Sequence, residues 1–430
     1  MLIFSKQSLR LLSFYFLPFV LLIAGKASWA QNPALVSNQG VANSEATSPP
    51  SFQQALEAAW QLDSTARTVN AKQAEIAAKR QAASGWIAGA PSLSIAHRTD
   101  RLNRNSGLRE YEAEVDLPLW DRSTQAAAKQ QLSMEERIIA PSAQLAKLKL
   151  AGSLRSLMAD DALAHLEHDL ALRKVAESEQ LAADIERRLR AGDVARLDAL
   201  QALSSIIQAR GQAAIALGAK QRILGRWKSA TNLDQMAQQS AAPQSIASPA
   251  PAVPQQHPAM LAGRAQLALA QAKLRLAETD RRDPMELALG ITRERSAVGA
   301  ASESNLRVVL RIPLGNDNRN MPRITSARTE VSLAQAELDT TERQLTLDIS
   351  AALAALQTSQ LLYKTMQERA QIVAQSQSLI TRAYSLGERD LLARLRADSE
   401  RYEADLAASR ALAEQSRAAA QLQQALGLLP

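Results

Sequence analysis

The sequence predicts a mainly α-helical protein with a small β part, arranged as a duplicated helix–strand–strand–helix unit. Aromatic residues make up only 3% of the 430 residues, and there are only 16 Gly and 16 Pro. This composition favours extended helices that pack through small side chains. The strand-like segment around Pro118 returns at Pro313, and a helix-ending turn at Gly192 returns at Gly387, both 195 positions later. Two motifs with one offset indicate a duplicated half rather than a short-period solenoid.

Residues 1–30 have the pattern of a secretory signal peptide. Lys6 and Arg10 precede an apolar run that ends near Ala24, and small side chains lead to a cleavage point after Ala30. The apolar run is short for a membrane span, so a retained anchor is the weaker interpretation. No later stretch reaches about 18 consecutive apolar residues, so we expect residence in a membrane to depend on β-strands.

The first repeat is expected over residues 51–230, after a polar and disordered segment at 31–50. Ser51 and Gln54 form a capping-box pattern at its start. Pro141 lies inside its long helix and is expected to kink that helix. The expected elements are a helix from Phe52 to about Gly85, strands at about 91–99 and 109–117, a helix from about Ser123 to Arg190, a tip at 191–193 and a helix to about Lys228.

The second repeat is expected over residues 258–430, after a linker at 231–257 that is rich in Gln, Ala, Ser and Pro. Prolines exclude a regular helix in this linker, namely Pro243, Pro249, Pro251 and Pro254. His257-Pro258 opens the repeat with Pro at the first helical position. The expected elements are strands at about 285–294 and 305–313, a helix from about Pro322 to Ser385, a tip at 386–388 and a helix to about Gly427.

The four predicted strands alternate between apolar and polar residues. Leu287, Leu289 and Ile291 share one face of the third strand, and Arg307 and Arg311 lie on the polar face of the fourth. An outer-membrane β-barrel shows this pattern, with lipid outside and water inside. Four strands cannot close a barrel, so closure requires other copies of the chain, and three copies would supply twelve strands.

The helix lengths predict how the helices are arranged. At about 1.5 Å per residue, each long helix spans about 100 Å. The two shorter helices of the second repeat sum to about the same length, so they can flank the long one end to end. The long helix carries several heptad seams, which indicates neighbours on more than one side, as in a cylinder of helices.

These features together resemble the TolC family of outer-membrane efflux ducts, over essentially the whole chain from Ser51 onward. The segments Val115-Asp-Leu-Pro-Leu and Leu310-Arg-Ile-Pro-Leu, the His257-Pro258 start and the two glycine turns carry the resemblance. The resemblance implies a homotrimer with a 12-stranded outer-membrane β-barrel, continued into the periplasm by an α-helical barrel. It also implies passive transport, with docking to a periplasmic adaptor (membrane fusion protein) and an inner-membrane pump of the resistance-nodulation-division type.

The resemblance also implies an adaptor-docking motif at each tip, of the form Arg-x-x-x-small/Leu-Gly. The first tip has Ala where the family has Leu. Glycine permits the positive φ of a helix-ending turn, and an exposed arginine can donate hydrogen bonds to a partner helix. The matching residues are Arg187, Ala191 and Gly192 at the first tip, and Arg382, Leu386 and Gly387 at the second.

A closed periplasmic entrance is the second site that the resemblance implies. Tyr384, Arg389 and Asp198 match the latch positions of the family. An exposed ion pair contributes only about 0–1 kcal/mol, so docking could release a latch of this kind. The acidic rings that narrow the entrance in the family are replaced by Ala393 and Arg396, which predicts a less cation-selective entrance.

Other classes of function find little support in the sequence. His165 and His168 share a helix face, but two side chains are too few for a metal site, and a solvated face is the better interpretation. No catalytic motif or cofactor motif stands out, so we expect neither enzyme activity nor a cofactor. The charges are too interleaved for nucleic acid. The absence of Cys excludes a lipid anchor on an N-terminal cysteine.

The sequence therefore predicts the outer-membrane duct of an efflux system for small toxic compounds, either drugs or metal ions. A type I secretion duct for proteins would use the same fold and remains an alternative. A periplasmic coiled-coil adaptor is less consistent, because adaptors usually carry one helical hairpin, whereas this chain predicts two.

Overall fold

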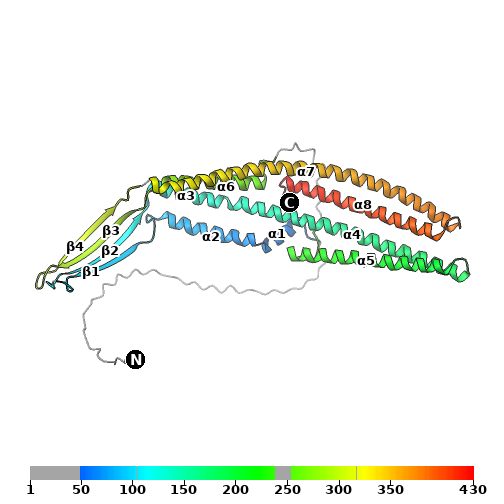
Figure 1. Cartoon of the computed structure of the whole chain (residues 1–430), viewed down its shortest axis with the longest axis horizontal. Helices are drawn as coiled ribbons and strands as arrows, with labels where there is room; N and C mark the ends of the chain where they lie inside the picture. Colours follow the sequence, from blue (N-terminus) through cyan, green and yellow to red (C-terminus); the bar gives the residue numbers. More distant parts are fainter. Residues whose placement is uncertain (1–48, 104, 238–252, 316) are drawn as a thin grey trace, which may run out of the picture. The chain divides into compact units, whose positions relative to one another are not determined.

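A computed structural model of the protein describes residues 49–430, except for residues 104, 238–252 and 316. The predicted signal peptide and nearly all of the segment at 31–50 lie outside the described residues, as do Pro243, Pro249 and Pro251 of the linker. Most of the described chain is helical, and its strands form one small sheet (Figure 1). None of the helices in the described ranges is both long and apolar enough to cross a bilayer.

The first helical segment is interrupted where the sequence predicts one helix. Helix α1 spans Phe52–Leu62 and α2 spans Ser64–Ser84. The predicted capping box is confirmed, since Ser51 Oγ accepts from Gln54 N at 3.2 Å and Gln54 Oε1 accepts from Ser51 N at 2.9 Å. The expectation of an unbroken helix is wrong because Asp63 is extended (ψ 137°) and its carboxylate caps α2 through Thr65 N at 2.7 Å. An Asp side chain offers the backbone an alternative to helical hydrogen bonds.

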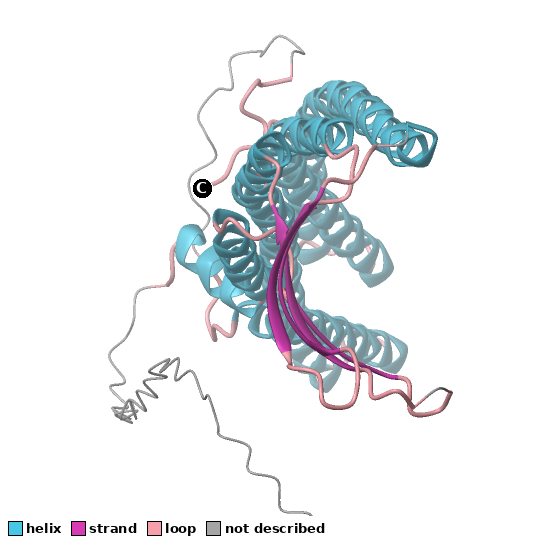
Figure 2. Cartoon of the chain, turned by 90° about the vertical axis from the view of Figure 1, so that its left-hand side faces the viewer, coloured by secondary structure: helices cyan, strands magenta, loops and turns pink. Residues whose placement is uncertain are grey.

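The four strands lie close to their predicted positions. They are β1 (Ser92–Thr99), β2 (Arg109–Leu119), β3 (Met285–Arg295) and β4 (Glu303–Arg311). All neighbours are antiparallel in the order β1-β2-β3-β4, so the β2–β3 pairing joins the two halves of the chain. Figure 2 shows them as one curved sheet (magenta).

The long helical stretch of the first half is interrupted one turn before Pro141, where the sequence predicts a single helix with a kink. Helix α3 spans Arg122–Arg137 and α4 spans Ile139–Ala191, with Ile138 between them. Pro141 has no N–H to donate to the Arg137 carbonyl, so the helical hydrogen bonds fail one turn before the proline. Helix α5 (Arg196–Thr231) then packs back along α4.

The second half contains one long helix with two shorter helices alongside it. Helix α7 spans Asp317–Ser385, whereas α6 spans Pro258–Thr279 and α8 spans Leu391–Ala425. Both short helices pack on α7, α6 near the sheet and α8 near the far end (Figure 1). The end-to-end arrangement predicted from the helix lengths is confirmed, although α7 begins five residues before Pro322.

The packing between helices uses many small side chains. One cluster joins α1, α4 and α5 around the fully buried Trp227 and Leu154, with Trp227 Nε1 donating to Gln235 O at 2.9 Å. A second cluster lies near the tips, and α8 also packs along α4. The contacts between α4 and α8 hold the two hairpins, α4–α5 and α7–α8, side by side.

Candidate docking tips and entrance latch

Both tips end in the same backbone turn. Gly192 and Gly387 adopt left-handed conformations with φ of 82° and 79°. One residue later, Asp193 N donates to Arg188 O and Glu388 N donates to Ala383 O, each at 2.9 Å. This is the Schellman pattern that satisfies the last carbonyls of a helix. A Cβ at either glycine would meet nothing within 4 Å, so backbone conformation rather than space requires glycine there.

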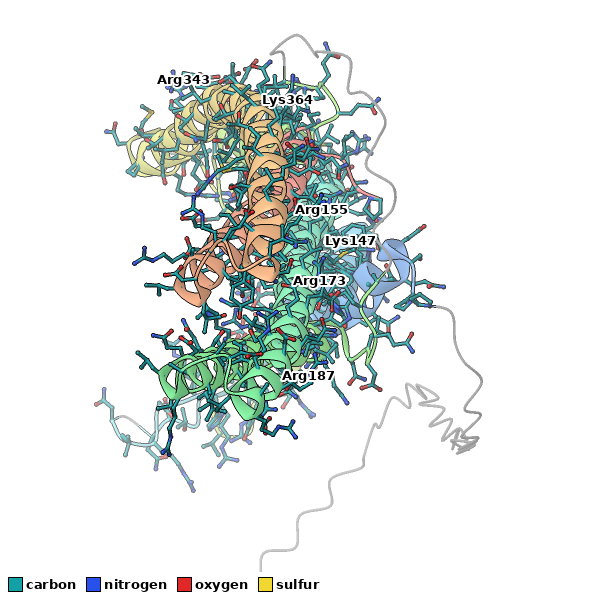
Figure 3. The ribbon with its side chains drawn as sticks, turned by 90° about the vertical axis from the view of Figure 1, so that its right-hand side faces the viewer. Lys147, Arg155, Arg173, Arg187, Arg343 and Lys364 are labelled. Carbon is teal, nitrogen blue, oxygen red and sulfur yellow. The ribbon has the colours of Figure 1, made fainter. Side chains whose placement is uncertain are left out.

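The tips leave the side chains of the predicted docking motif in solvent. The Arg187 side chain is 71% exposed and is held by Asp184 Oδ1 at 3.2 Å and by the Ala183 carbonyl at 3.4 Å. Figure 3 shows it on the first hairpin. Arg382 is exposed and has no ion pair among the described residues, and Leu386 beside it is 67% exposed. Hydrogen bonds therefore hold the Arg187 guanidinium in place at the first tip. At the second tip the Arg382 guanidinium is less constrained and lies near the apolar side chain of Leu386.

Tyr384 is buried rather than displayed at the tip. It is 9% exposed and packs with Ile185 of α4, Ala202 of α5 and Leu391 of α8. The Arg188 guanidinium lies 5.2 Å from the centre of its ring, a cation–π contact. Burial raises the pKa of Tyr384. This side chain therefore joins the two hairpins just behind the tips.

Asp198 and Arg389 do not meet within one chain. Asp198 lies in the first turn of α5, where its Oδ2 accepts from Ala195 N at 3.3 Å. Its negative charge also raises the pKa of Tyr384, although burial is the larger cause. Arg389 is exposed and makes no ion pair within the part of the chain that the structure describes. The structure therefore brings Asp198 and Tyr384 together, and the latch through Arg389 stays a prediction.

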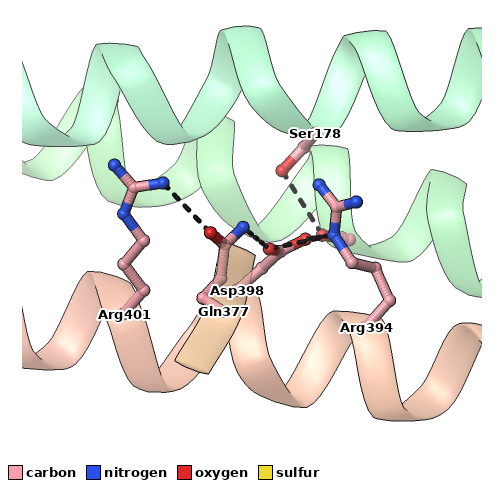
Figure 4. A network of polar contacts seen from close by, with 6 residues as sticks. Ser178, Gln377, Arg394, Asp398 and Arg401 are labelled. Carbon is pink, nitrogen blue, oxygen red and sulfur yellow. Dashed lines mark hydrogen bonds and ion pairs between the residues drawn. The ribbon is translucent and has the colours of Figure 1, made fainter. Parts of the chain in front are cut away.

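A polar network that the sequence did not reveal joins α7 to α8 above the tips (Figure 4). Asp398 accepts from Gln377 Nε2 at 2.6 Å and from Arg394 Nε at 3.0 Å. Arg401 donates to Gln377 Oε1 at 3.3 Å, and Gln377 is only 7% exposed. The i,i+4 spacing of Arg394 and Asp398 was a visible signal. Nothing in the sequence pointed to Gln377, because its partners lie on another helix.

The structure also gives the positions of the other residues that the sequence singled out, at the entrance and on the histidine-bearing helix face. Ala393 is half-buried and its N–H donates to Asp390 Oδ1 at 2.9 Å, while Arg396 is exposed on α8. His165 lies 3.5 Å from Asp161, and His168 lies 3.9 Å from Asp169. Across the described ranges, no three His, Asp or Glu side chains converge in a way that could hold a metal ion.

Comparison with known proteins finds a likeness in sequence for one part of the chain and a likeness in fold for most of it. Residues 252–428 match the sequence profile of a family described as "Outer membrane efflux protein". No curated protein matches the chain.

Several solved structures share the fold over most of the chain. A membrane protein from Pseudomonas aeruginosa has 20% identity and a TM-score of 0.68, covering 87% of this chain and 90% of that one. The outer membrane protein VceC from Vibrio cholerae has 15% identity and a TM-score of 0.68, covering 87% and 96%. The open state of the MtrE outer membrane channel from Neisseria gonorrhoeae has 16% identity and a TM-score of 0.66, covering 88% and 89%. At these identities the likeness shows a common fold.

Proposed function

We propose that the chain is the outer-membrane channel of a tripartite efflux system. Residues 252–428 match the outer membrane efflux protein family, and the chain shares its fold with solved outer membrane channels. It would act as a passive exit tunnel for small toxic compounds. The observation that carries the proposal is the pair of matching tips, which present exposed arginines at the end of the helices farthest from the sheet (Figure 1).

The two faces of the sheet support a position in the outer membrane. One face carries apolar side chains that are exposed in the single chain, including Ile95 (78%), Ile291 (60%) and Leu306 (76%). The opposite face carries ion pairs, such as Arg311 with Glu286 at 2.7 Å. Lipid on the first face and water on the second would satisfy both.

The free edges of the sheet support assembly into a homotrimer. Within the described residues, β1 pairs only with β2 and β4 pairs only with β3, so each outer strand keeps one unpaired edge. Unpaired edges bind further strands. Three copies would pair edge to edge into a 12-stranded barrel, and their helices would continue it into the periplasm.

The tips support docking to a periplasmic adaptor, which would connect the channel to an inner-membrane pump of the resistance-nodulation-division type. Arg382 and Leu386 offer a cation and an apolar side chain side by side, a combination that suits a partner helix. The energy for transport would come from the pump.

Electron microscopy of the protein extracted from outer membranes, together with its oligomer mass, tests the proposal. We expect a trimeric tube with helices spanning about 100 Å and a short barrel at one end. A monomeric particle without a barrel would overturn the channel and would favour an adaptor-like role.

A further inference from the structure

Three arginines lie together at the end of the sheet that is farthest from the helices (Figure 1). Arg109 of β2 is the direct cross-strand partner of Arg295 of β3, and Arg293 lies two positions along β3, opposite Tyr111. Because side chains alternate along a strand, these four lie on one face, which is also the face of Ile291. Arg109, Arg293 and Arg295 are called the arginine cluster below.

The arginine cluster has no carboxylate partner among the described residues. Arg109 and Arg293 are exposed, and their side chains form neither an ion pair nor a hydrogen bond within the described chain. Arg295 donates to the Gly107 carbonyl at 3.5 Å, and its Nε is buried without a hydrogen-bond partner in the same ranges. Like charges directly opposite each other on a sheet are destabilising. An anion from outside the described chain would therefore stabilise the pair of Arg109 and Arg295.

The carboxylates near this end of the sheet are directed elsewhere. Asp100, in the loop after β1, accepts hydrogen bonds from Ser106 N at 2.6 Å and from Gly107 N at 3.3 Å. Three glutamates alternate with the residues of the cluster's face and so lie on the opposite face, namely Glu110, Glu294 and Glu303. Within the described strands, no carboxylate therefore shares a face with the cluster at this end.

The side chains of the cluster's face change in order along the strands. Ala113 pairs with Ile95 on one side and with Ile291 on the other, and these belong to the apolar band. Two positions nearer the hairpin loops, Tyr111 stacks on His97 with ring centres 4.5 Å apart, and the arginines lie beside and beyond this pair. Apolar, aromatic and then charged side chains follow one another in this order where a protein leaves the membrane core. With the helices in the periplasm, this end of the sheet reaches the outer leaflet.

We propose that the arginine cluster binds the phosphate groups of the outer-leaflet glycolipid, the lipid A part of lipopolysaccharide. The proposal rests on the proposed function, because the apolar face must lie in an outer membrane with the hairpin loops at its outer surface. The acyl chains of the glycolipid then follow the apolar band, and its phosphorylated sugars lie level with the arginines.

The charge of a phosphate monoester suits the arginine cluster. A guanidinium binds phosphate oxygens through two parallel hydrogen bonds. A phosphate monoester carries a charge of about −1.5 to −2 at neutral pH, whereas the phosphodiester of a glycerophospholipid has only one ionisable oxygen. Lipid A carries its phosphates as monoesters on a glucosamine disaccharide. Direct cross-strand partners have Cβ atoms about 4.5–5.5 Å apart, so one monoester can contact both Arg109 and Arg295.

Arg109→Gln and Arg293→Gln test the cluster without removing an internal contact, because neither side chain bonds another group in the described chain. Arg98→Gln is the matched control, since Arg98 is also exposed at this end of the sheet but lies on the opposite face, 3.7 Å from Glu110. Each full-length protein is extracted into detergent and incubated with equal amounts of lipid A, dephosphorylated lipid A and phosphatidylglycerol. Native mass spectrometry then identifies the lipids that remain bound.

We expect the wild-type protein and Arg98→Gln to retain lipid A in preference to the other two lipids. Arg109→Gln and Arg293→Gln should each retain it roughly tenfold less, as expected for the loss of one hydrogen bond between charged groups. Equal retention by wild type and either variant would overturn the cluster as the site.

The other lipids test which chemistry the cluster recognises. Equal retention of lipid A and its dephosphorylated form would overturn the recognition of phosphate. A preference for phosphatidylglycerol would overturn the glycolipid as the ligand, and so would the release of bound lipid A by millimolar inorganic phosphate.

Failure of this site would differ from failure of the proposed function. Channels formed by the wild-type preparation in planar bilayers, without selective binding of lipid A, would contradict only the site. A protein that forms neither a trimer nor a channel would contradict the proposed function itself.

Discussion

At the scale of single residues, the two halves of the chain share backbone conformations at equivalent positions, even where their residue types differ. Gly192 and Gly387 share a left-handed turn at an offset of 195, and so do Asn232 (φ 58°) and Gly427 (φ 74°), which end α5 and α8. The first pair was visible in the sequence because both members are glycine. The second was hidden because Asn replaces Gly in one copy, and Asn is among the few other residues that tolerate this conformation.

The tip glycines should be sensitive to substitution by alanine. Gly387→Ala should lower the free energy of unfolding by about 1–2 kcal/mol, because a Cβ is strained at φ 79°. Gly211→Ala is the control, since Gly211 lies within α5 with nothing within 4 Å of an added Cβ, and it should stabilise by about 0.5–1 kcal/mol. Thermal unfolding followed by circular dichroism measures both. Identical melting temperatures for Gly387→Ala and wild type would contradict the strained turn.

His257 should make stability depend on pH. It is 3% exposed, its Nδ1 accepts from Ala259 N at 3.1 Å at the start of α6, and burial lowers its pKa. The folded protein therefore binds fewer protons than the unfolded chain between the lowered pKa and about 6.5. The stability that His257 contributes is complete above about pH 6.5 and is lost as pH falls through the folded pKa.

His257→Asn provides the test of this pH dependence. Asn retains an N-cap acceptor and does not titrate. Lys149 of α4 and Asp348 of α7 line the cavity next to His257 and remain in the variant, so they provide the same background. We expect the melting temperature to fall less between pH 7.5 and 5.5 in His257→Asn than in wild type. An equal fall in both proteins would exclude His257 as the cause.

At the scale of elements, hydrophobic alternation predicted the strands well, because the apolar residues of each strand must share one face. A distortion near Pro141 was also predictable, since a proline has a fixed effect on helical hydrogen bonds, and the break lies one turn earlier, at Ile138. The break at Asp63 was not, because an Ala-rich helical pattern continues on both sides and only one carboxylate interrupts it. The contact between Gln377 and Asp398 depends on how α7 and α8 are aligned, which no local pattern specifies.

The Asp398 network should hold α7 and α8 in register near the tips. Asp398→Asn removes the charge that Arg394 and Gln377 bind, and should cost about 1–3 kcal/mol. Hydrogen exchange should accelerate in the last turns of α7 and the first turns of α8. Glu414→Gln serves as the control, because Glu414 also pairs with an arginine on α8 but is more exposed. Unchanged exchange in Asp398→Asn would show that the network does not stabilise the tip.

At the scale of the whole molecule, the tips of the two hairpins expose different side chains, although both tips have the same backbone turn. The first hairpin fixes Arg187 through Asp184, whereas the second leaves Arg382 unpaired in the described chain. Tyr384 of the second hairpin packs against side chains of the first hairpin just behind the tips. The sequence identified the exposed arginines. It did not show that Tyr384 is buried, because burial there depends on side chains from three other helices.

Docking through the tips predicts a loss of transport without a loss of folding. If the proposed function holds, Arg382→Glu and Gly387→Pro should each leave a folded trimer in the membrane but abolish drug resistance in cells that depend on the protein for efflux. Arg343→Glu is the control, because Arg343 is also exposed on α7 and, within the described residues, its side chain donates only to Thr340 of its own helix. Normal resistance with Arg382→Glu would remove the docking role from the second tip.

The predicted entrance latch would have to form between copies of the chain, because Arg389 has no ion pair within the described chain and Asp198 is held by its own helix. If Arg389 reaches Asp198 when copies assemble, the combined variant Asp198→Ala and Arg389→Ala should raise single-channel conductance in planar bilayers. Asp198→Ala alone also removes a hydrogen bond at the start of α5, so Arg389→Ala alone separates the latch from helix capping. Both the single Arg389 variant and the double variant should conduct more than wild type. Wild-type conductance in both would show that the pair does not close the entrance.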